Sequence, residues 1–361
     1  MHPKTAQNIL HRNVQESPTS ANLVRFLKEA SGLKSLKNSL MVNTSSPLSF
    51  IGEVLRHGYS ETLPLCVINL ARINDFRHIN KFFESVNENL EMGGYFVGAV
   101  ETAHAREDRV KARIPSLLRK PYLFFDYLLL RVWPKLPYAK RAYFFLTKGR
   151  NRVISEMEAY GRLYSCGFKL VQSQETDGML HFVAQNVKNP EYNKEATYGP
   201  LIKLRRVGKG GKLLNVYKMR TMSPYAEYVQ QLIYEWNGVG DGAKFKDDPR
   251  ITRLGGFMRK FWIDELPMLF NLLRGDLKVF GVRPISPHYF SLYPKEFQEF
   301  RKKFKPGLIT PVYVEIPKSV DDTVDIERRY LEAYQRNPIL TDLRYTFLAF
   351  YNIIFKRTRS H

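Results

Sequence analysis

Apolar positions in the first half of the chain follow two periods, and their order predicts an α/β arrangement. Residues 65–76 (LCVINLARINDF) begin with the continuous apolar run of a buried strand. Residues 77–90 (RHINKFFESVNENL) place apolar side chains at helical spacing, and the glycines at 93–94 favour a helix end. A second apolar run, residues 95–102 (YFVGAVET), follows. Strand, helix, glycine pair and strand predict a parallel unit with a right-handed crossover.

Residues 152–187 continue this pattern with a helix and a strand pair. The stretch 152–168 predicts a helix that ends at Gly167, and 169–187 predicts two strands joined near Asp177 and Gly178. This order resembles the second half of a class I methyltransferase-like fold, including its closing strand pair. The glycine-rich first loop of that family is absent, since no G-x-G-x-G follows a strand in the first 100 residues. We therefore expect an incomplete Rossmann-like domain with a scaffold or docking role, and no methyl transfer.

The polar stretch 188–200 (KNPEYNKEATYGP) predicts a domain boundary. We expect a poorly ordered or helical N-terminal segment over 1–60, a degenerate Rossmann-like domain over 61–190 and a second domain over 191–361. From Gly199 onward the chain changes to alternating apolar and basic residues. The predicted fold class is thus α/β, an incomplete Rossmann-like domain followed by a mixed α+β domain.

The net charge of the chain limits the classes of binding partner that are expected. The 361 residues carry a formal net charge of +21, and 44% of them are hydrophobic. This excess predicts anionic partners, which are nucleic acid, an anionic membrane face or phosphorylated substrates. No nucleic-acid recognition motif accompanies the charge, so we expect no nucleic-acid partner. Cys66 and Cys166 are far apart in sequence and are expected to be buried apolar residues in a reducing cytoplasm.

Two apolar segments with basic flanks bear on membrane contact. The first residues contain no apolar core of a signal peptide, and no run of 18 apolar residues predicts an ordinary spanning helix. Residues 119–135 (RKPYLFFDYLLLRVWPK) and 343–359 (LRYTFLAFYNIIFKRTR) come nearest. Each is either a core helix with basic ends or a helix that lies in a membrane interface.

The second half begins with a basic hairpin. Residues 201–222 (LIKLRRVGKGGKLLNVYKMRTM) alternate apolar and basic side chains around a glycine turn at 208–211. The hairpin is either a solvated surface ribbon or a ribbon that faces phosphates or lipid headgroups.

The stretch 261–284 (FWIDELPMLFNLLRGDLKVFGVRP) concentrates charge in an apolar setting. Asp264 and Glu265 stand beside Pro267, which favours a helix start, so an acidic helix N-terminus is one interpretation. The arginines around it support another. Carboxylates flanked by arginines suit a reaction on a pyrophosphate, in which one carboxylate attacks, another holds Mg²⁺ and arginines bind phosphoryl oxygens.

Several motifs then occur in one order, namely GPLIKLRRVGKGGKLLNVYKMRTM, DDPRITRLGGFMRK, DELPMLFNLLRGDLKVFGVRP and KPGLITP. Over residues 198–358 the chain resembles the bacterial sugar transferases, the monotopic polyprenyl-phosphate phosphoglycosyl transferases. The resemblance implies transfer of a phosphosugar from a nucleotide diphosphate sugar to a polyprenyl (undecaprenyl) phosphate. This step begins exopolysaccharide, capsule or O-antigen (lipopolysaccharide) synthesis.

The resemblance also implies roles for individual residues. Asp264 would be the nucleophile that carries the phosphosugar, and Asp264 and Glu265 would hold Mg²⁺. The phosphate-binding residues would be Lys218, Arg220, Arg250, Arg253 and Arg283. The protein would be peripheral or monotopic at the cytoplasmic face of the inner membrane. The family's re-entrant helix is missing before residue 198, so the alternative is a catalytically weak or inactive family member that acts as a membrane-surface assembly or scaffold protein.

Overall fold

The protein consists of two compact units that share one chain. The computed structural model describes residues 26, 28–30, 38–59, 62–192, 198–237 and 248–355. The first unit comprises Met1–Gly199 and Ser223–Trp236, and the second comprises Pro200–Met222 and Asn237–His361. The chain therefore leaves the first unit after Gly199 and returns to it for fourteen residues, 223–236.

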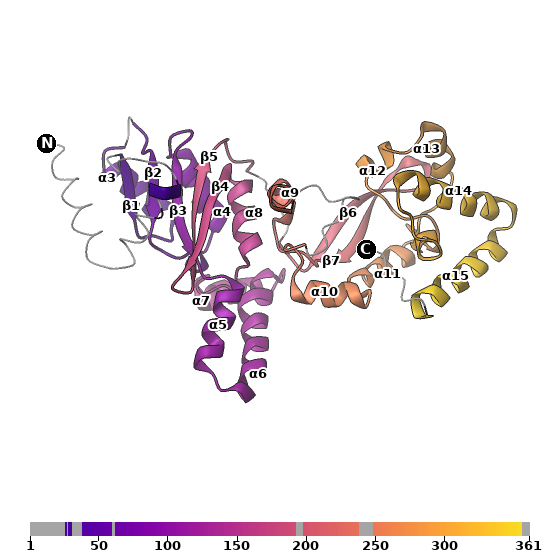
Figure 1. The fold of residues 1–361 in the computed structure, drawn as a ribbon, viewed down its shortest axis with the longest axis horizontal. Helices are drawn as coiled ribbons and strands as arrows, with labels where there is room; N and C mark the ends of the chain where they lie inside the picture. The colour runs from indigo at the N-terminus through magenta and orange to yellow at the C-terminus, as the bar shows by residue number, and fades with distance from the viewer. Residues whose placement is uncertain are drawn as a thin grey trace. The chain divides into compact units, whose positions relative to one another are not determined.

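A five-stranded mixed sheet forms the centre of the first unit (Figure 1). Its strands are β1 (Ser39–Val42), β2 (Cys66–Asn69), β3 (Tyr95–Val100), β4 (Phe168–Thr176) and β5 (Met179–Asn186). The sheet order is β1-β2-β3-β5-β4, with β1, β2 and β3 parallel and β5 antiparallel to both neighbours. This confirms the expected incomplete Rossmann-like arrangement with its closing strand pair. Strand β1 lies within the segment 1–60, for which no strand was predicted.

Local sequence explains the elements around this sheet. The helices of the first unit are α3 (Pro47–Arg56), α4 (Ile79–Glu88), α5 (Ala103–Arg113), α6 (Ser116–Tyr127), α7 (Lys140–Thr147), α8 (Glu156–Ser165) and α9 (Gln230–Asn237). Helix α4 buries Phe82, Phe83 and Val86, the face that its helical spacing indicated. Asp177 and Gly178 both have positive φ, which makes the tight turn between β4 and β5. Cys66 and Cys166 are free and buried, and burial raises the pKa of each thiol to about 12.

Helices α5 and α6 extend from the sheet as a pair at the carboxyl end of β3 (Figure 1). Helix α6 buries none of its residues and exposes Leu117, Phe124 and Phe125. The segment 119–135 is therefore no core helix along its first part. A π-helical turn (Leu128–Val132) and a 3₁₀ turn (Trp133–Lys135) continue it. In the part of the chain that the structure describes, no helix is both long and apolar enough to cross a membrane.

Residues 223–236 complete the first unit by packing against α8. Tyr225, Val229 and Ile233 of this segment are buried. A Cβ on Gly161 of α8 would lie 2.3 Å from the carbonyl oxygen of Tyr225, so the segment approaches the helix backbone directly. The hydroxyl groups of Ser155 and Ser223 lie 2.8 Å apart in a hydrogen bond that fixes the start of the segment.

The second unit is built from two short strand pairs and a helical layer. Its strands are β6 (Leu201–Val207), β7 (Leu213–Met219), β8 (Lys278–Phe280) and β9 (Gly307–Ile309). Its helices are α10 (Arg253–Lys260), α11 (Met268–Leu273), α12 (Pro287–Ser291), α13 (Lys295–Lys302), α14 (Val320–Arg336) and α15 (Pro338–Phe355). β6 and β7 pair as the expected antiparallel hairpin, and Gly210 and Gly211 have positive φ in its turn. β8 and β9 are parallel.

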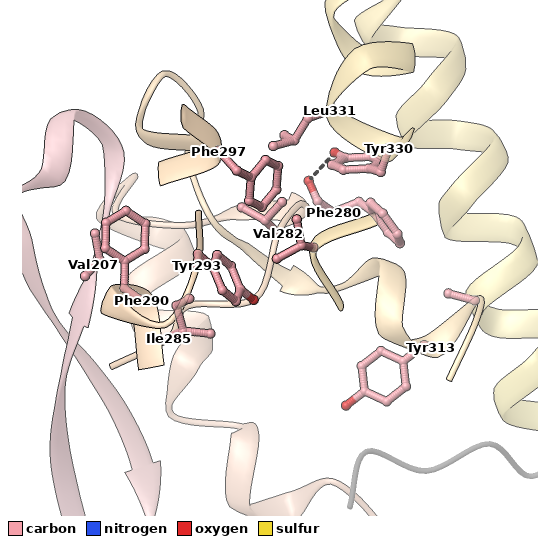
Figure 2. Packing of buried hydrophobic residues seen from close by; sticks show 12 residues of the cluster. Val207, Phe280, Val282, Ile285, Phe290, Tyr293, Phe297, Tyr313, Tyr330 and Leu331 are labelled. Atoms are coloured by element: carbon pink, nitrogen blue, oxygen red, sulfur yellow. Dashed lines mark hydrogen bonds between the residues drawn. The ribbon is translucent and has the colours of Figure 1, made fainter. Parts of the chain in front are cut away.

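Aromatic side chains dominate the core of the second unit, which Figure 2 shows. Phe280 of β8 packs edge-to-face with Tyr330 of α14, with ring centroids 5.2 Å apart. The Tyr330 hydroxyl donates to the carbonyl oxygen of Phe280 at 3.3 Å (Figure 2) and also reaches Asp342 at 2.7 Å. This core therefore joins the β8–β9 pair to α14 and α15.

Candidate active site

The acidic pair lies in a sharp turn between two helices of the second unit. Helix α10 ends at Lys260, and Trp262 takes the left-handed conformation with φ 55°. A 3₁₀ turn, Ile263–Glu265, then holds Asp264 and Glu265, and α11 begins after Pro267. A left-handed backbone is unfavourable for a bulky residue, so surrounding contacts must hold this turn. One of them is a hydrogen bond of 3.2 Å from the Trp262 indole to the hydroxyl of Tyr313.

Strand β7 brings a cation to the acidic pair. The ammonium of Lys218 lies 2.7 Å from Oε1 of Glu265, and both side chains are about one-fifth exposed. Partial burial strengthens such a pair compared with one on the open surface. The structure therefore unites two predicted site residues that are far apart in sequence.

The carboxyl group of Asp264 is half-buried, and its environment favours the protonated form. Burial raises its pKa, Lys218 opposes this shift, the negative charge of Glu265 reinforces it, and Arg259 opposes it more weakly. The net result is a pKa above the ordinary value for aspartate. Asp264 thus carries a carboxylate that water stabilises poorly and that Lys218 partly neutralises.

Helix α10 is fixed against the end of β7 by Thr221. Thr252 caps α10 by accepting a hydrogen bond from the amide of Gly255, and its own amide donates to the carbonyl oxygen of Thr221. A Cβ at Gly255 would lie 1.9 Å from that carbonyl oxygen, so only glycine fits. The Arg259 guanidinium donates to the Thr221 hydroxyl at 3.0 Å. These contacts orient the helix that leads into the acidic turn.

Asn271 is a positioning residue that the sequence analysis did not single out. It is fully buried in α11, and its amide nitrogen donates to the carbonyl oxygen of Asn215 at 2.7 Å. Its side-chain oxygen accepts from the amide of Tyr217 at 3.0 Å. It therefore joins α11 to β7 next to Lys218. A single amide within the apolar run MLFNLL was the signal, because a buried amide needs hydrogen-bond partners.

Arg283 follows β8 and is held by a buried ion pair. Its amide donates to Glu327, and its carbonyl oxygen accepts from Arg301. Glu327 is fully buried, and Arg301 donates to it from Nε at 2.6 Å. The Arg283 charge contributes, after burial, to the lowered pKa of Arg206. Among the described residues, the partners of Arg283 thus belong to β6, α13 and α14, and none is Asp264.

The remaining predicted phosphate ligands are spread around the hairpin and α10. Arg250 is buried and donates to Asp248, with the closest approach at 2.6 Å. Burial alone would raise the pKa of Asp248, but the hydrogen bonds from Arg250 lower it below the ordinary value. Arg253 is exposed at the start of α10, and the amide of Arg220 donates to Pro200 at 2.6 Å. The structure brings Lys218, Asp264 and Glu265 together, while Arg250 is occupied by Asp248.

The carboxylates of the acidic turn can be compared with the ligands that Mg²⁺ usually takes in proteins. Across the described ranges no group of three or more His, Cys, Asp or Glu side chains gathers as a metal site. Mg²⁺ commonly takes one or two carboxylates together with substrate phosphates and water. Asp264 and Glu265 supply two adjacent, partly exposed carboxylates, so the residues fit that mode of binding.

Comparison with known proteins shows which family the second half of the chain resembles. The family model described as bacterial sugar transferase matches residues 192–356. This part of the chain is similar to the bacterial sugar transferases. It contains every residue of the acidic turn and of the hairpin that meets it.

Curated relatives agree with this assignment. The galactosyl transferase CpsE of Streptococcus agalactiae is 32% identical over 162 residues, which cover 44% of this chain and 35% of the relative. The undecaprenyl-phosphate galactose phosphotransferase of Salmonella typhimurium is 38% identical over 112 residues, 29% of this chain and 23% of the relative. A UDP-N-acetylgalactosamine-undecaprenyl-phosphate N-acetylgalactosaminephosphotransferase of Aeromonas hydrophila is 36% identical over 115 residues, 30% and 24% respectively. The aligned region thus spans about a third or less of the length of these three relatives.

Solved structures resemble the chain only loosely. An O-methyltransferase family protein from Burkholderia thailandensis aligns with a TM-score of 0.26 at 8% identity, covering 45% of this chain and 56% of that protein. The description of the first unit as an incomplete Rossmann-like fold is therefore based on its strand order and not on these alignments.

Proposed function

We propose that the protein is a phosphoglycosyl transferase that moves a phosphosugar from a nucleotide diphosphate sugar to undecaprenyl phosphate. The observation that carries this proposal is the half-buried Asp264 carboxyl group beside the Lys218–Glu265 ion pair. It lies in the domain whose curated relatives include undecaprenyl-phosphate sugar phosphotransferases.

The reaction consists of two displacements at one phosphorus. A carboxylate oxygen of Asp264 attacks the sugar-linked phosphorus and forms an O–P bond. The bond from that phosphorus to the nucleoside monophosphate breaks, and its electron pair leaves with the nucleotide. An oxygen of undecaprenyl phosphate then attacks the same phosphorus and displaces Asp264 as a carboxylate. Two steps let a soluble donor and a lipid acceptor use one site in turn.

The environment of Asp264 suits the role of nucleophile. A desolvated carboxylate with a raised pKa is more basic than one in water, and a fixed orientation reduces the entropy lost on reaching the transition state. Lys218 holds Glu265 and offsets part of the negative charge that the donor phosphates bring. Mg²⁺ held by Asp264 and Glu265 would neutralise phosphoryl oxygens of the donor. Arg220, Arg253 and Arg283 are the proposed further phosphate ligands.

Apolar side chains next to the site suit a lipid acceptor. Phe257 and Phe261 at the end of α10, and Leu266, Phe270 and Leu273 around α11, are exposed. Lys260 and Arg274 lie over the rings of Phe261 and Phe270, with nitrogen or guanidinium carbon 5.6 and 5.5 Å from the ring centroids. Exposed aromatic residues with adjacent cations favour a membrane interface with anionic headgroups. We place the protein at the cytoplasmic face of the inner membrane, where it would begin the synthesis of a surface polysaccharide.

The test is covalent capture on a defined peptide. The protein is mixed with radiolabelled UDP-galactose or UDP-N-acetylgalactosamine, Mg²⁺ and no lipid acceptor, then quenched and digested with trypsin. The phosphosugar is expected on peptide 261–274, together with released uridine monophosphate. Undecaprenyl phosphate should then discharge the label as a lipid-linked sugar.

Variants separate the nucleophile from its neighbours. Asp264→Asn should lose both the label and the release of nucleotide, whereas Asp325→Asn, on an exposed part of α14, should keep both. Label on Glu265 would contradict the assignment of the nucleophile. A wild-type protein that is inert with both donors would favour the non-catalytic assembly protein instead.

A further inference from the structure

A basic cavity lies in the first unit, within the part of the chain that the sugar transferase family does not explain. It has a volume of about 850 Å³. Its wall is formed by the start of α4, by the turns after α6, by α7 and α8, and by Tyr198 and Tyr225. All of these residues belong to the first unit, so the cavity is independent of the acidic turn.

The charge of the lining is strongly one-sided. Eight lysine or arginine side chains line the cavity, and among the described residues around it Glu158 is the one carboxylate. Glu158 is already shared by Lys135 at 3.2 Å, Arg162 at 2.9 Å and Arg131 at 3.8 Å. Like charges gathered around one compensated carboxylate repel one another, which favours an anion that enters from outside.

Local electrostatics show how concentrated this positive charge is. Burial, which Glu158 opposes and Arg131 and Arg162 reinforce, lowers the pKa of Lys135 to about 7. Burial lowers the pKa of Arg152 to about 10, with Arg162 acting in the same direction. The pKa of His78 is lowered first by burial and then by Arg77 and other cations. Each of these groups would gain from a nearby anion.

Arg152 and the start of α4 bring positive charge to one wall of the cavity. The Nε atom of Arg152 is buried and has no hydrogen-bond partner, although its terminal nitrogen donates to the carbonyl oxygen of Phe76. Helix α4 begins at the same wall, and its N-cap residue His78 makes no side-chain cap. An anion beside the Arg152 guanidinium would also lie at the positive end of the α4 dipole.

Aromatic rings add an apolar side to the basic lining. Phe144 and Phe145 of α7 line the cavity, and Phe145 remains 83% exposed. Arg77 and Arg152 lie over the Phe144 ring, with guanidinium carbons 6.0 and 5.7 Å from its centroid. The site therefore offers cations for a phosphate and, next to them, rings for an apolar or planar neighbour of that phosphate.

We propose that this cavity is a phosphate-binding site for a ligand that joins a phosphate or diphosphate to an apolar or aromatic group. The phosphate binds between Arg152, Lys140 and the start of α4, and the attached group lies against Phe144 and Phe145. The phosphate belongs either to a soluble nucleotide or to a lipid headgroup. In both cases the first unit binds a ligand of its own, separate from the proposed chemistry at Asp264.

The first experiment measures ligand binding in the cavity of the whole protein through the protection of its lysines from chemical modification. Sulfo-N-hydroxysuccinimide acetate modifies exposed lysines, and mass spectrometry measures modification at each one. EDTA is present throughout, which removes Mg²⁺ and keeps donor binding at the acidic turn out of the measurement. Inorganic pyrophosphate, or phosphatidylcholine vesicles that contain phosphatidic acid, should protect Lys81, Lys140 and Lys148. Lys169 and Lys188, which are exposed outside the cavity, should be modified as before.

The two probes distinguish the sources of the phosphate. Protection by pyrophosphate indicates a soluble ligand, and protection by phosphatidic acid vesicles alone indicates a lipid headgroup. Plain phosphatidylcholine vesicles should protect none of these lysines. If neither probe protects the cavity lysines beyond Lys169 and Lys188, the proposal is wrong.

A charge-matched pair of variants provides the second measurement. Lys81→Gln with Arg141→Gln removes two exposed cations of the cavity, and Lys169→Gln with Lys188→Gln removes two elsewhere on the same unit. The cavity variant should bind the effective probe at least about tenfold more weakly, because the loss of a single charge-assisted hydrogen bond already changes the dissociation constant by about that factor. The control variant should bind as the wild type does. Equal weakening in both variants would indicate binding through net charge alone and would overturn the proposal. Transferase activity is not part of either readout, so the proposed function stands or falls separately.

Discussion

Lys218 and Glu265 form an ion pair of 2.7 Å between the basic hairpin and the acidic turn. Side chains alternate between the two faces of a strand, so Lys218 and Lys203, which lies opposite Tyr217, point to opposite faces of the hairpin. The hairpin thus directs Lys218 toward the acidic turn and Lys203 away from it. This arrangement separates a lysine of the site from lysines that contribute only to net charge.

Lys218→Met should reduce transfer, whereas Lys203→Met should not. Without the ammonium, Glu265 loses its ion-pair partner. The pKa of Asp264 should also rise further, because in the wild-type protein Lys218 opposes that rise. Breaking a partly buried pair by removing one side costs up to about 3–5 kcal/mol, so a loss of at least about tenfold in kcat/KM is expected. The measurement is the release of uridine monophosphate by both variants. Equal activities of the two variants would show that Lys218 does not contribute to transfer more than a lysine outside the site.

The pH dependence of transfer should reflect the raised pKa of Asp264. The nucleophile acts as a carboxylate, and a raised pKa means that acidification protonates it at a higher pH than an ordinary aspartate, whose pKa is about 3.9. The acidic limb of kcat/KM should therefore lie above that value. In Lys218→Met it should move to still higher pH. An acidic limb below that of ordinary aspartate would contradict the burial of Asp264.

Gly255 and Gly256 are adjacent in α10 but should respond oppositely to alanine. A Cβ at Gly255 would lie 1.9 Å from the carbonyl oxygen of Thr221, whereas a Cβ at Gly256 meets nothing within 4 Å. Gly255→Ala should force α10 away from β7, lower the melting temperature and reduce transfer. Gly256→Ala should be neutral or stabilise by about 0.5–1 kcal/mol, because alanine favours a helix. Hydrogen exchange over residues 250–260 would locate the effect, and similar behaviour of the two variants would exclude the close approach.

Glu327→Gln should weaken the support of Arg283. Glu327 is fully buried and accepts from both Arg301 and the amide of Arg283, so its neutralisation leaves the buried Arg301 without its counter-charge. Loss of one partner of a buried ion pair costs about 3–5 kcal/mol. We expect a lower melting temperature and a higher KM for the nucleotide sugar. Glu332→Gln, at an exposed position of the same helix, is the matched control and should change neither value.

Periodic and turn signals predicted the local elements well. The apolar spacing of 77–90 gave the buried face of α4, and the glycines at 210–211 gave the turn of the β6–β7 hairpin. These features depend on neighbours in sequence, for which hydropathy and backbone preference are sufficient. The acidic pair was also found, because charge within an apolar run is conspicuous. Its role as nucleophile and metal ligand stays a prediction.

Contacts between segments that are far apart in the chain could not be predicted from the sequence. Nothing in residues 223–236 indicates that they pack on α8, and nothing in Thr221 indicates that it contacts Gly255 and Arg259. The short strand β1 carries four residues, too few for a periodic signal. The bracing of Arg283 by Arg301 and Glu327 depends on helices that come later in the chain. Each of these contacts joins segments whose meeting is decided by packing and not by local preference.

The return of residues 223–236 to the first unit has a consequence for the order of synthesis. Tyr225, Val229 and Ile233 fill the face of α8, yet the ribosome makes them only after the whole β6–β7 hairpin. The first unit therefore cannot finish folding while it is the only part of the chain outside the ribosome. The hairpin that delivers Lys218 must already have emerged when the first unit closes. A nascent chain arrested before residue 223 should expose α8 to chaperones and proteases, and one arrested far enough along for residues 223–236 to have left the ribosome should not.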